Sequence, residues 1–334
     1  MSSSRDRQKA VKKLRTFLFS QKIDVRDYRD RIDEVFSAVF LPNHVDCQEK
    51  DYGDVACDVI TPEMYSFDRI LLYIHGGSFV GGSKKAYRSF VSSLATAVSA
   101  KAVVPEFDLA PAHPYPFAVE SIQKVFKAVF TEFHVQNILS TKTDSKPKVP
   151  EIIIAADSSG ASIAMALVLS LNERFRATLR SLIFFSPWLD ISEENEKLKM
   201  RKCSDDVFTA ESVRFAAENY VPTAENRKNP LVSPLYATKE MLAKFPPVYI
   251  QYGSKDMFVE DYERFQELLF SAGVKCDLDM WDGMMPLFEF ADEYLSESHL
   301  AVEKIGKMIT ARSYENESEL EIGLELERVQ TRTM

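Results

Sequence analysis

Short apolar runs that alternate with longer amphipathic segments constrain the fold of this chain most strongly. The amphipathic segments have apolar residues at helical spacing and cover residues 85–99, 118–133, 162–171, 262–272 and 287–309. The apolar runs have the length of buried strands and cover residues 70–74, 102–107, 151–156, 182–185, 248–252 and 276–281. Strands that alternate with helices need crossover connections, so the pattern predicts an α/β fold with a mainly parallel sheet covered on both faces.

Three regions depart from this alternation. Residues 1–45 contain two amphipathic helical patterns, which predict an N-terminal helical cap or lid. The main α/β domain is expected over 46–312, with an insertion at about 191–245 that is polar, helical around 211–220, and expected to cap the sheet. Residues 313–334 are rich in glutamate with little apolar patterning, which predicts a poorly ordered acidic tail.

The composition excludes several classes of function. A formal net charge of -9 argues against binding to nucleic acid, because phosphate neutralisation needs clustered Lys and Arg. No apolar run approaches the length of a membrane-spanning helix or of a signal-peptide core, so we expect a cytoplasmic protein. The four cysteines, Cys47, Cys57, Cys203 and Cys276, lack metal-ligand spacing and suggest reduced thiols, with no metal or other cofactor.

The first candidate site segment is His75-Gly76-Gly77-Ser78-Phe79, directly after the run 70–74. Paired glycines here would let backbone N–H groups of Gly76 and Gly77 face a developing negative oxygen, as in the oxyanion hole of ester hydrolases. Taken alone, a glycine-rich turn at the exit of a strand explains the segment about as well.

The second candidate is Ala156-Asp157-Ser158-Ser159-Gly160, between the run 151–156 and an alanine-rich helical segment. A nucleophile elbow needs small residues two positions either side of its serine, because strand and helix cross closely there. Ala156 and Gly160 meet this need, and the Ser159 N–H would then face the oxyanion. A serine that only caps a helix is the simpler alternative for Ser158.

The third candidate is Asp256, in Gly253-Ser254-Lys255-Asp256 after the run 248–252. Open α/β sheets place their sites at the carboxyl ends of strands, although an exposed loop aspartate would look the same in sequence. The three candidates taken together are more informative than each one alone. Oxyanion strand, serine elbow and acid occur in the chain order of an α/β-hydrolase.

At these motifs the chain resembles the hormone-sensitive-lipase type of α/β-hydrolase, a carboxylesterase family with an HGGG-type motif and a GDSAGG-type elbow. The resemblance covers about 69–290 and includes Leu109–Pro116, Ser186–Asp190, Asn229–Tyr236 and Pro246–Gly253. It implies an α/β-hydrolase fold with Ser158 as nucleophile, Asp256 as acid, and an oxyanion or ligand-binding site at Gly76, Gly77, Ser78 and Ser159. It also implies a possible homodimer, because related esterases often dimerise.

The resemblance fails at the catalytic base. The family has a histidine in a Gly-x-x-His-Gly-Phe-like stretch, and the matching residues 282–288 read Asp-Gly-Met-Met-Pro-Leu-Phe. Pro286 therefore stands at the histidine position and Leu287 at the following glycine. Proline has no side-chain proton acceptor and no backbone N–H. For each of the five histidines, His44, His75, His113, His134 and His299, we expect a structural role.

Two functions follow from these residues. In the first, the chain is a catalytically impaired hydrolase, a pseudoenzyme that holds a small ester-like or carboxylate ligand in the former active site. Plant gibberellin receptors resemble it in having an HGGSF-like motif, a DSSG elbow and an N-terminal helical lid without the base. In the second, it is an active carboxylesterase or lipase of short acyl esters with a non-standard base, as the presence of both Ser158 and Asp256 would favour. Only composition supports a third function, an interaction scaffold that uses the acidic tail.

Overall fold

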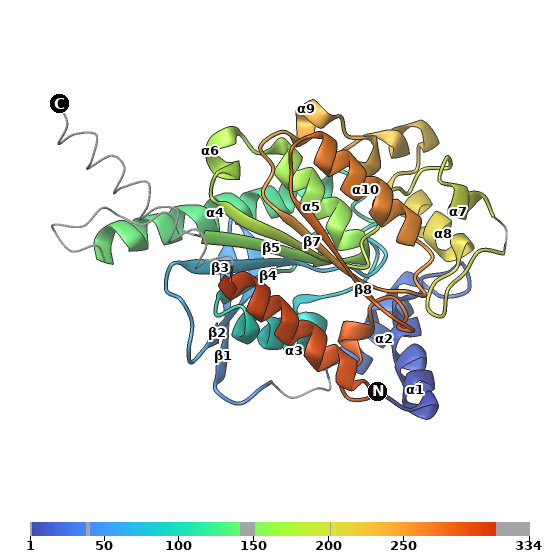
Figure 1. The fold of residues 1–334 in the computed structure, drawn as a ribbon, viewed down its shortest axis with the longest axis horizontal. Helices are drawn as coiled ribbons and strands as arrows, with labels where there is room; N and C mark the ends of the chain where they lie inside the picture. Colours follow the sequence, from blue (N-terminus) through green and yellow to red (C-terminus); the bar gives the residue numbers. More distant parts are fainter. Residues whose placement is uncertain (1, 38–40, 141–150, 201, 312–334) are drawn as a thin grey trace.

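The computed structural model describes residues 2–37, 41–140, 151–200 and 202–311, so the predicted acidic tail lies outside the described residues. Within them, one sheet has the strand order β1-β2-β4-β3-β5-β6-β7-β8 (Figure 1). The strands are β1 (Val45–Tyr52), β2 (Val55–Pro62), β3 (Arg69–Ile74), β4 (Lys101–Pro105), β5 (Glu151–Asp157), β6 (Leu179–Phe185), β7 (Val248–Gly253) and β8 (Cys276–Trp281).

The six strands from β3 to β8 are parallel to one another, as the alternation of strands and helices predicted. All residues of β3 and β7 are buried, as expected for strands covered on both faces. The two strands that the sequence did not indicate, β1 and β2, pair antiparallel at one edge, and β2 continues antiparallel to β4. Most of β1 is exposed, so it has no continuous apolar run.

Helices cover both faces of the sheet. Figure 1 shows α4 (Phe117–Ser140), α5 (Ser158–Ser170) and α10 (Val259–Ser271) on one face. It shows α3 (Lys84–Ala97) and a C-terminal helix over 296–311 on the other. The predicted helix over 287–309 was wrong in its first part, because that helix begins at 296. The preceding residues form a buried turn and the short 3-10 helix η4 (Phe288–Phe290).

The N-terminal helices and the insertion lie together at one end of the sheet (Figure 1). The N-terminal elements are α1 (Ser4–Leu14), η1 (Arg15–Phe17) and α2 (Val25–Ser37). The insertion contains α7 (Glu196–Lys199), α8 (Ala210–Tyr220), η2 (Ala224–Lys228), η3 (Pro234–Tyr236) and α9 (Lys239–Leu242), and α6 (Glu173–Arg176) precedes β6. Arg29 on α2 donates to the carbonyl oxygens of Val80 and Ala110, so α2 is fastened to the loops that follow β3 and β4.

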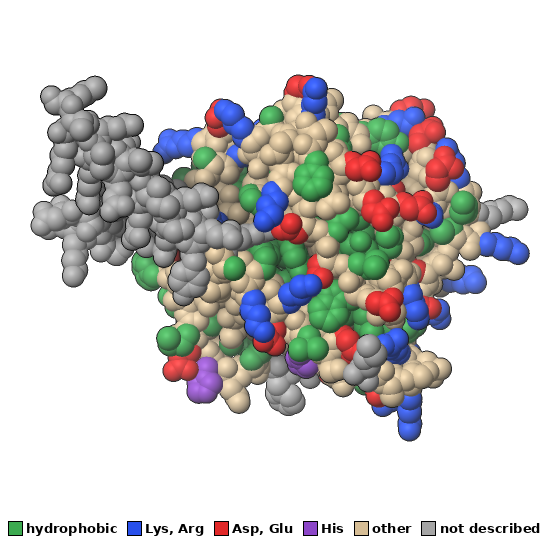
Figure 2. Space-filling view, viewed as in Figure 1, with side chains coloured by type: hydrophobic (Ala, Val, Ile, Leu, Met, Phe, Trp, Pro, Cys, Tyr) green, Lys and Arg blue, Asp and Glu red, His purple; other side chains and the backbone are tan. Residues whose placement is uncertain are grey.

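The surface carries charges of both signs. Figure 2 shows Lys and Arg side chains interspersed with Asp and Glu over the face in view. That face of the described residues therefore presents no extended basic patch that would follow a nucleic-acid backbone. Among the described residues, no helix is both long and apolar enough to cross a membrane.

Candidate functional site

The candidate residues follow the carboxyl ends of neighbouring strands. In the sheet, β3, β5, β6, β7 and β8 lie side by side in that order, and all are parallel. The His75–Phe79 segment follows β3, Ser158 follows β5, and Asp256 follows β7. Because parallel strands end at the same edge, the topology gathers these segments at one edge of the sheet.

Ser158 lies at a sharp turn between β5 and α5. Its backbone has φ of 46°, in the left-handed region that L-residues rarely adopt, and it is the first residue of α5. A Cβ at Gly160 would lie 2.3 Å from the Ile74 carbonyl oxygen, which explains why the crossing needs glycine two residues after the serine. Both features agree with the predicted nucleophile elbow.

Within the described part of the chain, the Ser158 hydroxyl has no hydrogen-bond partner that could take its proton. Ser158 is 1% exposed, and its Oγ is buried with no hydrogen-bond partner among the described residues. Its backbone carbonyl accepts a hydrogen bond of 3.0 Å from the Trp188 N–H, which ties the turn to the segment after β6. The turn is therefore well supported, but its hydroxyl is not activated by a base.

In the segment after β3, one predicted oxyanion donor is already hydrogen-bonded within the protein and the others are free. The Gly76 N–H donates to Asp157 Oδ1 at 2.9 Å, so the prediction that it faces an oxyanion is corrected. The N–H groups of Gly77 and Ser78 have no acceptor among the described residues. The Ser159 N–H lies in the first turn of α5, where helices leave N–H groups unpaired. These three are the candidate oxyanion donors.

Side-chain contacts hold this segment against the elbow and the N-terminal helices. The Ser159 hydroxyl accepts a hydrogen bond of 3.0 Å from the Phe79 N–H. The Ser78 hydroxyl donates to the Phe17 carbonyl oxygen at 3.1 Å, and the Tyr28 hydroxyl donates to the same oxygen at 2.7 Å. Gly77 has φ of 96°, which a residue with a Cβ would not easily adopt.

Asp157, which sequence reasoning did not single out, holds the segments around the candidate site together through hydrogen bonds. Its Oδ1 accepts from the Tyr73 hydroxyl at 2.9 Å as well as from Gly76, and its Oδ2 accepts from the Tyr87 hydroxyl at 3.0 Å. Burial raises the pKa of Asp157 to about 7, although these hydrogen bonds act in the opposite direction. Asp157 therefore fixes the glycine loop relative to Ser158.

Asp256 is buried and its carboxylate is fully hydrogen-bonded. The Phe258 N–H donates to Oδ1 at 2.9 Å and the Tyr262 hydroxyl donates to Oδ2 at 2.7 Å. Burial raises the pKa of Asp256, and these two hydrogen bonds and the Ser186 side chain act in the opposite direction. Neither donor is an imidazole, so the acid is hydrogen-bonded without one.

A second carboxyl group, that of Asp205 in the insertion, lies close to Asp256. Its Oδ1 accepts hydrogen bonds of 2.7 Å from the N–H groups of Val207 and Phe208. Its Oδ2 accepts one of 3.3 Å from the Met257 N–H. Burial, followed by the charge of Asp256, raises the pKa of Asp205 to about 7. Asp205 therefore joins the insertion to the loop that carries Asp256.

The loop after β8 is buried where the resemblance placed the base. Pro286 is buried, and Leu287 is fully buried with φ of 58°, a conformation that favours glycine. This conformation fits the resemblance, which placed a glycine at the position of Leu287. The Leu287 N–H donates to the Ser186 hydroxyl at 3.2 Å. This hydrogen bond ties the loop to Ser186, which directly follows β6.

His75, the histidine nearest to the candidate residues in sequence, is part of the packing. It is 1% exposed, and its ring stacks on Phe107 with 4.3 Å between centroids and on Tyr87 with 5.1 Å. Its Nδ1 lies 2.9 Å from the Gly76 carbonyl oxygen, and burial lowers its pKa to about 4. His75 therefore stays neutral and supports the glycine loop.

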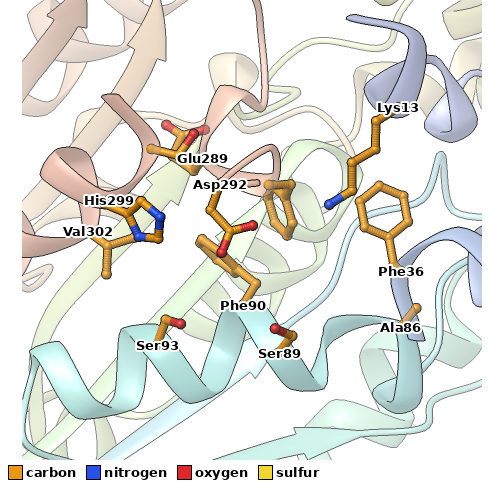
Figure 3. Close-up of a pocket in the computed structure, with 12 residues that line it drawn as sticks. Lys13, Phe36, Ala86, Ser89, Phe90, Ser93, Glu289, Asp292, His299 and Val302 are labelled. Atoms are coloured by element: carbon orange, nitrogen blue, oxygen red, sulfur yellow. The ribbon is translucent and has the colours of Figure 1, made fainter. Parts of the chain in front are cut away.

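The other histidines have partners elsewhere. His44 pairs with Glu63, His113 lies 3.9 Å from Asp108, and His134 stacks on Phe130. His299 lines a cavity between the N-terminal helices, α3 and the C-terminal helix (Figure 3), and the volume of this cavity is about 80 Å³. Lys13, Phe36, Phe90 and Asp292 line the same cavity.

Aromatic side chains surround the candidate site. Phe79 stacks on Tyr220 of α8 with 4.0 Å between ring centroids and meets Trp188 edge-on at 5.9 Å. Phe19 of the N-terminal segment stacks on Phe215 of α8 at 5.0 Å. The N-terminal segment and the insertion therefore meet through aromatic contacts beside the HGGSF segment. In the described residues, no group of three or more His, Cys, Asp or Glu could hold a metal ion.

The chain was compared with known proteins at the level of family, sequence and structure. Residues 71–289 match the family with the alpha/beta hydrolase fold. An esterase from Acinetobacter venetianus is 31% identical over 246 residues, which cover 74% of this chain and 76% of that protein. The chain belongs to the α/β-hydrolase family.

More distant relatives agree with this assignment. The putative acetyl-hydrolase LipR of Mycobacterium tuberculosis is 23% identical to this α/β-hydrolase over 91% of this chain and 93% of that protein. A crystal structure of an esterase from the bacterial hormone-sensitive lipase family superposes with a TM-score of 0.79 and 23% identity. That match covers 93% of this chain and 99% of the other, and shows the same fold. The chain is thus an esterase-like α/β-hydrolase.

Three residues that shape the site were missed from sequence, namely Asp157, Ser186 and Tyr262. Asp157 and Ser186 lie inside the segments quoted for the resemblance, and that position was the available signal. Tyr262 lies on α10, six residues beyond Asp256, and its role depends on the turn between them.

Proposed function

We propose that this esterase-like α/β-hydrolase holds a small ester or carboxylate beside Ser158 and hydrolyses esters poorly or not at all. One observation carries the proposal. The Ser158 hydroxyl has no hydrogen-bond partner among the described residues, while both oxygens of Asp256 have donors from the protein. In this proposal Ser158 is the nucleophile and Asp256 the acid, and no hydrogen-bonded base joins them in the described part of the chain.

A serine hydroxyl attacks an ester efficiently only when a base removes its proton, and the same base then protonates the leaving group. Pro286, at the position that the resemblance assigns to the base, can do neither. In serine proteases, loss of one triad member leaves about 10³–10⁴-fold acceleration over water, which comes from the oxyanion hole and from binding. A residual activity of this kind is the most that we expect here.

Binding, in contrast, does not need the base. The free N–H groups of Gly77 and Ser78, with that of Ser159, supply donors for a carbonyl or carboxylate oxygen. The aromatic rings around Phe79 supply an apolar wall for the rest of a small ligand. A donor cluster beside an apolar wall favours a short-chain carboxylate or ester.

The rate test uses p-nitrophenyl acetate with the wild type, Ser158→Ala and the double variant Pro286→His/Leu287→Gly. We expect negligible steady-state turnover in the wild type. The double variant restores the base position and the glycine after it, and we expect its turnover to rise and to be lost again on adding Ser158→Ala. Wild-type turnover near the enzyme median of about 10 s⁻¹, abolished by Ser158→Ala, would instead establish the alternative, an active carboxylesterase with a non-standard base.

The binding test uses butyrate and the fluorescence of Trp188, next to the site. The variant Trp281→Phe leaves Trp188 as the reporter, because the chain has two tryptophans. We expect a saturable change with butyrate that butan-1-ol does not produce. Ser158→Met, which places a larger side chain beside the oxyanion donors, should abolish the change, and circular dichroism checks that the variant is folded. Equal responses to butyrate and butan-1-ol would contradict a carboxylate site.

A further inference from the structure

The hydroxyl of Ser158 differs from the other serine hydroxyls near it. Those of Ser78 and Ser162 donate to backbone carbonyl oxygens of Phe17 and Trp188, and that of Ser159 accepts from the Phe79 N–H. The Ser158 hydroxyl is buried and uncommitted, beside three candidate oxyanion donors. A polar group left without a partner in a buried site calls for an explanation.

We infer that Ser158 accepts one acyl group from an activated ester and then retains it. This inference rests on the proposed function, because it requires both a site that binds esters and the lack of a base. The acyl donors concerned are aryl esters, whose leaving groups depart without being protonated first. The protein would then take up one acyl group per chain and would not turn over.

When the leaving group is good, the acylation step needs no acid to protonate it, so only the removal of the serine proton is unassisted. The Ser158 Oγ attacks the carbonyl carbon, a new Oγ–C bond forms, and the bond from carbon to the aryl oxygen breaks. The serine proton ends on the departing aryl oxygen, so the products are an acyl-serine and a phenol. The oxyanion donors stabilise the intermediate, and this stabilisation does not depend on the missing histidine. Because Ser158 is fully buried, the donor must enter when the structure opens, and the reaction is slow.

The deacylation step has neither a good leaving group nor an activated nucleophile. Water is a weaker nucleophile until a base takes its proton, and the serine oxygen is a poor leaving group until an acid protonates it. A histidine does both in active relatives of the triad type, and neither Asp256 nor Pro286 replaces it. Burial of the elbow also keeps water from the acyl group. The acyl-serine is therefore expected to persist.

The test is intact-protein mass spectrometry after incubation of the full chain with p-nitrophenyl acetate, followed by peptide mapping. We expect the mass to rise by one acetyl group, located on Ser158, with release of one equivalent of nitrophenol and no further turnover. Ser158→Ala should lack this label, whereas the neighbouring Ser162→Ala variant should keep it. In Pro286→His/Leu287→Gly we expect the label to disappear with time as nitrophenol release continues.

The outcomes separate this inference from the proposed function. Acetylation of the wild type and of Ser158→Ala at the same residues and to the same extent would overturn the inference, because the label would then be nonspecific. Absence of both label and turnover would also overturn it, while leaving the proposed function intact if butyrate still binds. Continued nitrophenol release that depends on Ser158 would overturn the inference, and release near about 10 s⁻¹ would overturn the proposed function as well. Retained folding of Ser158→Ala, checked by its unfolding temperature, makes its lack of label interpretable.

Discussion

The Tyr262 hydroxyl donates a 2.7 Å hydrogen bond to the Asp256 carboxylate. Tyr262 lies on α10, one turn beyond the loop that carries the acid, and is fully buried against it. With the Phe258 N–H on the other oxygen, the carboxylate is satisfied from its own loop and helix. A buried carboxylate without an imidazole partner would otherwise be left partly unpaired, which costs free energy. The contact explains how Asp256 remains stable without a base.

Removing this donor should therefore destabilise the fold. For Tyr262→Phe we expect the free energy of unfolding at pH 7 to fall by about 1–3 kcal/mol, the usual cost of an unpaired buried polar group. The pKa of Asp256 should rise further, because the lost hydrogen bond lowers it. Urea unfolding followed by circular dichroism measures the first effect. Tyr252→Phe, whose ring lies 4.8 Å from that of Tyr262, is the matched control and should lose less than about 0.5 kcal/mol.

The buried Asp157 should make stability depend on pH. Its pKa is about 7 in the folded chain, against an ordinary value of 3.8 for an aspartate in water, so between these values the folded state holds a proton that the unfolded state has lost. The contribution of Asp157 is fully present below about pH 4 and is lost as the pH rises through about 7. Each pKa unit corresponds to about 1.4 kcal/mol, so the total loss is at most about 4 kcal/mol.

Asp157→Asn removes this titration and tests the assignment. The free energy of unfolding of the wild type minus that of the variant should be larger at pH 5 than at pH 8. Urea unfolding at the two pH values measures the difference, and the exposed Asp30→Asn variant is the control. A difference between wild type and Asp157→Asn that stays constant over this range would show that Asp157 keeps its charge when folded.

Much of the fold was predictable because buried parallel strands have continuous apolar runs. The runs at 70–74 and 248–252 correspond to β3 and β7, in which each residue is buried. The strand β1 lies at an edge with most of its residues in contact with water, so its polar residues provided no such signal. The predicted start of the last helix was also wrong, because the turn at Leu287 depends on a hydrogen bond to Ser186, 101 residues away.

The positions of the site residues were predictable for a related reason. Ser158 and Asp256 directly follow apolar runs, and a parallel sheet brings the ends of such strands to one edge. Their hydrogen-bond partners were not predictable, because these come from tertiary contacts. Gly76 illustrates the limit: its sequence motif indicated an oxyanion donor, but its N–H is taken by Asp157, 81 residues away.

The close crossing of β3 and α5 at Gly160 should not tolerate even one methyl group. A Cβ there would lie 2.3 Å from the carbonyl oxygen of Ile74 and 2.5 Å from that of His75, and backbone atoms cannot move aside as a side chain can. We expect Gly160→Ala to lose at least about 3 kcal/mol of unfolding free energy or to fail to fold. Gly273→Ala is a control for added volume, since nothing lies within 4 Å of a Cβ there. Its backbone φ of 75° adds strain of about 1 kcal/mol. Similar losses in the two variants, measured by urea unfolding, would contradict the close crossing.

The N-terminal segment should contribute to the stability of the whole domain. Phe17 is 1% exposed and packs on Phe36, Tyr87 and Phe290 with ring centroids 4.4, 6.0 and 5.8 Å away. Truncation of a buried phenylalanine typically costs about 3–5 kcal/mol, and we expect this for Phe17→Ala. Phe270→Ala, at a residue that is 57% exposed, is the control and should change little. A Phe17→Ala variant with unaltered thermal unfolding would mean that the segment is only loosely attached.

At Leu287 the backbone conformation should reverse the usual order of stability, in which an alanine variant is more stable than a glycine variant. At a buried leucine in a helix, such as Leu94 of α3, glycine is less stable than alanine by about 1 kcal/mol, because it loses more backbone freedom on folding. At Leu287, alanine retains the strain of a φ of 58°, which costs about 1–2 kcal/mol and which glycine avoids. Both Leu287 variants lose core packing, so each is less stable than the wild type by about 2–5 kcal/mol.

We therefore expect Leu287→Gly to be at least as stable as Leu287→Ala, and Leu94→Gly to be less stable than Leu94→Ala, when all four are compared by urea unfolding. Comparing the two substitutions at one site cancels most of the packing loss, so the difference reports the backbone alone. If alanine were the more stable replacement at both positions, the left-handed turn at Leu287 would not be under strain. The same comparison matters for restoring a base, because a histidine at position 286 depends on the turn that residue 287 sets.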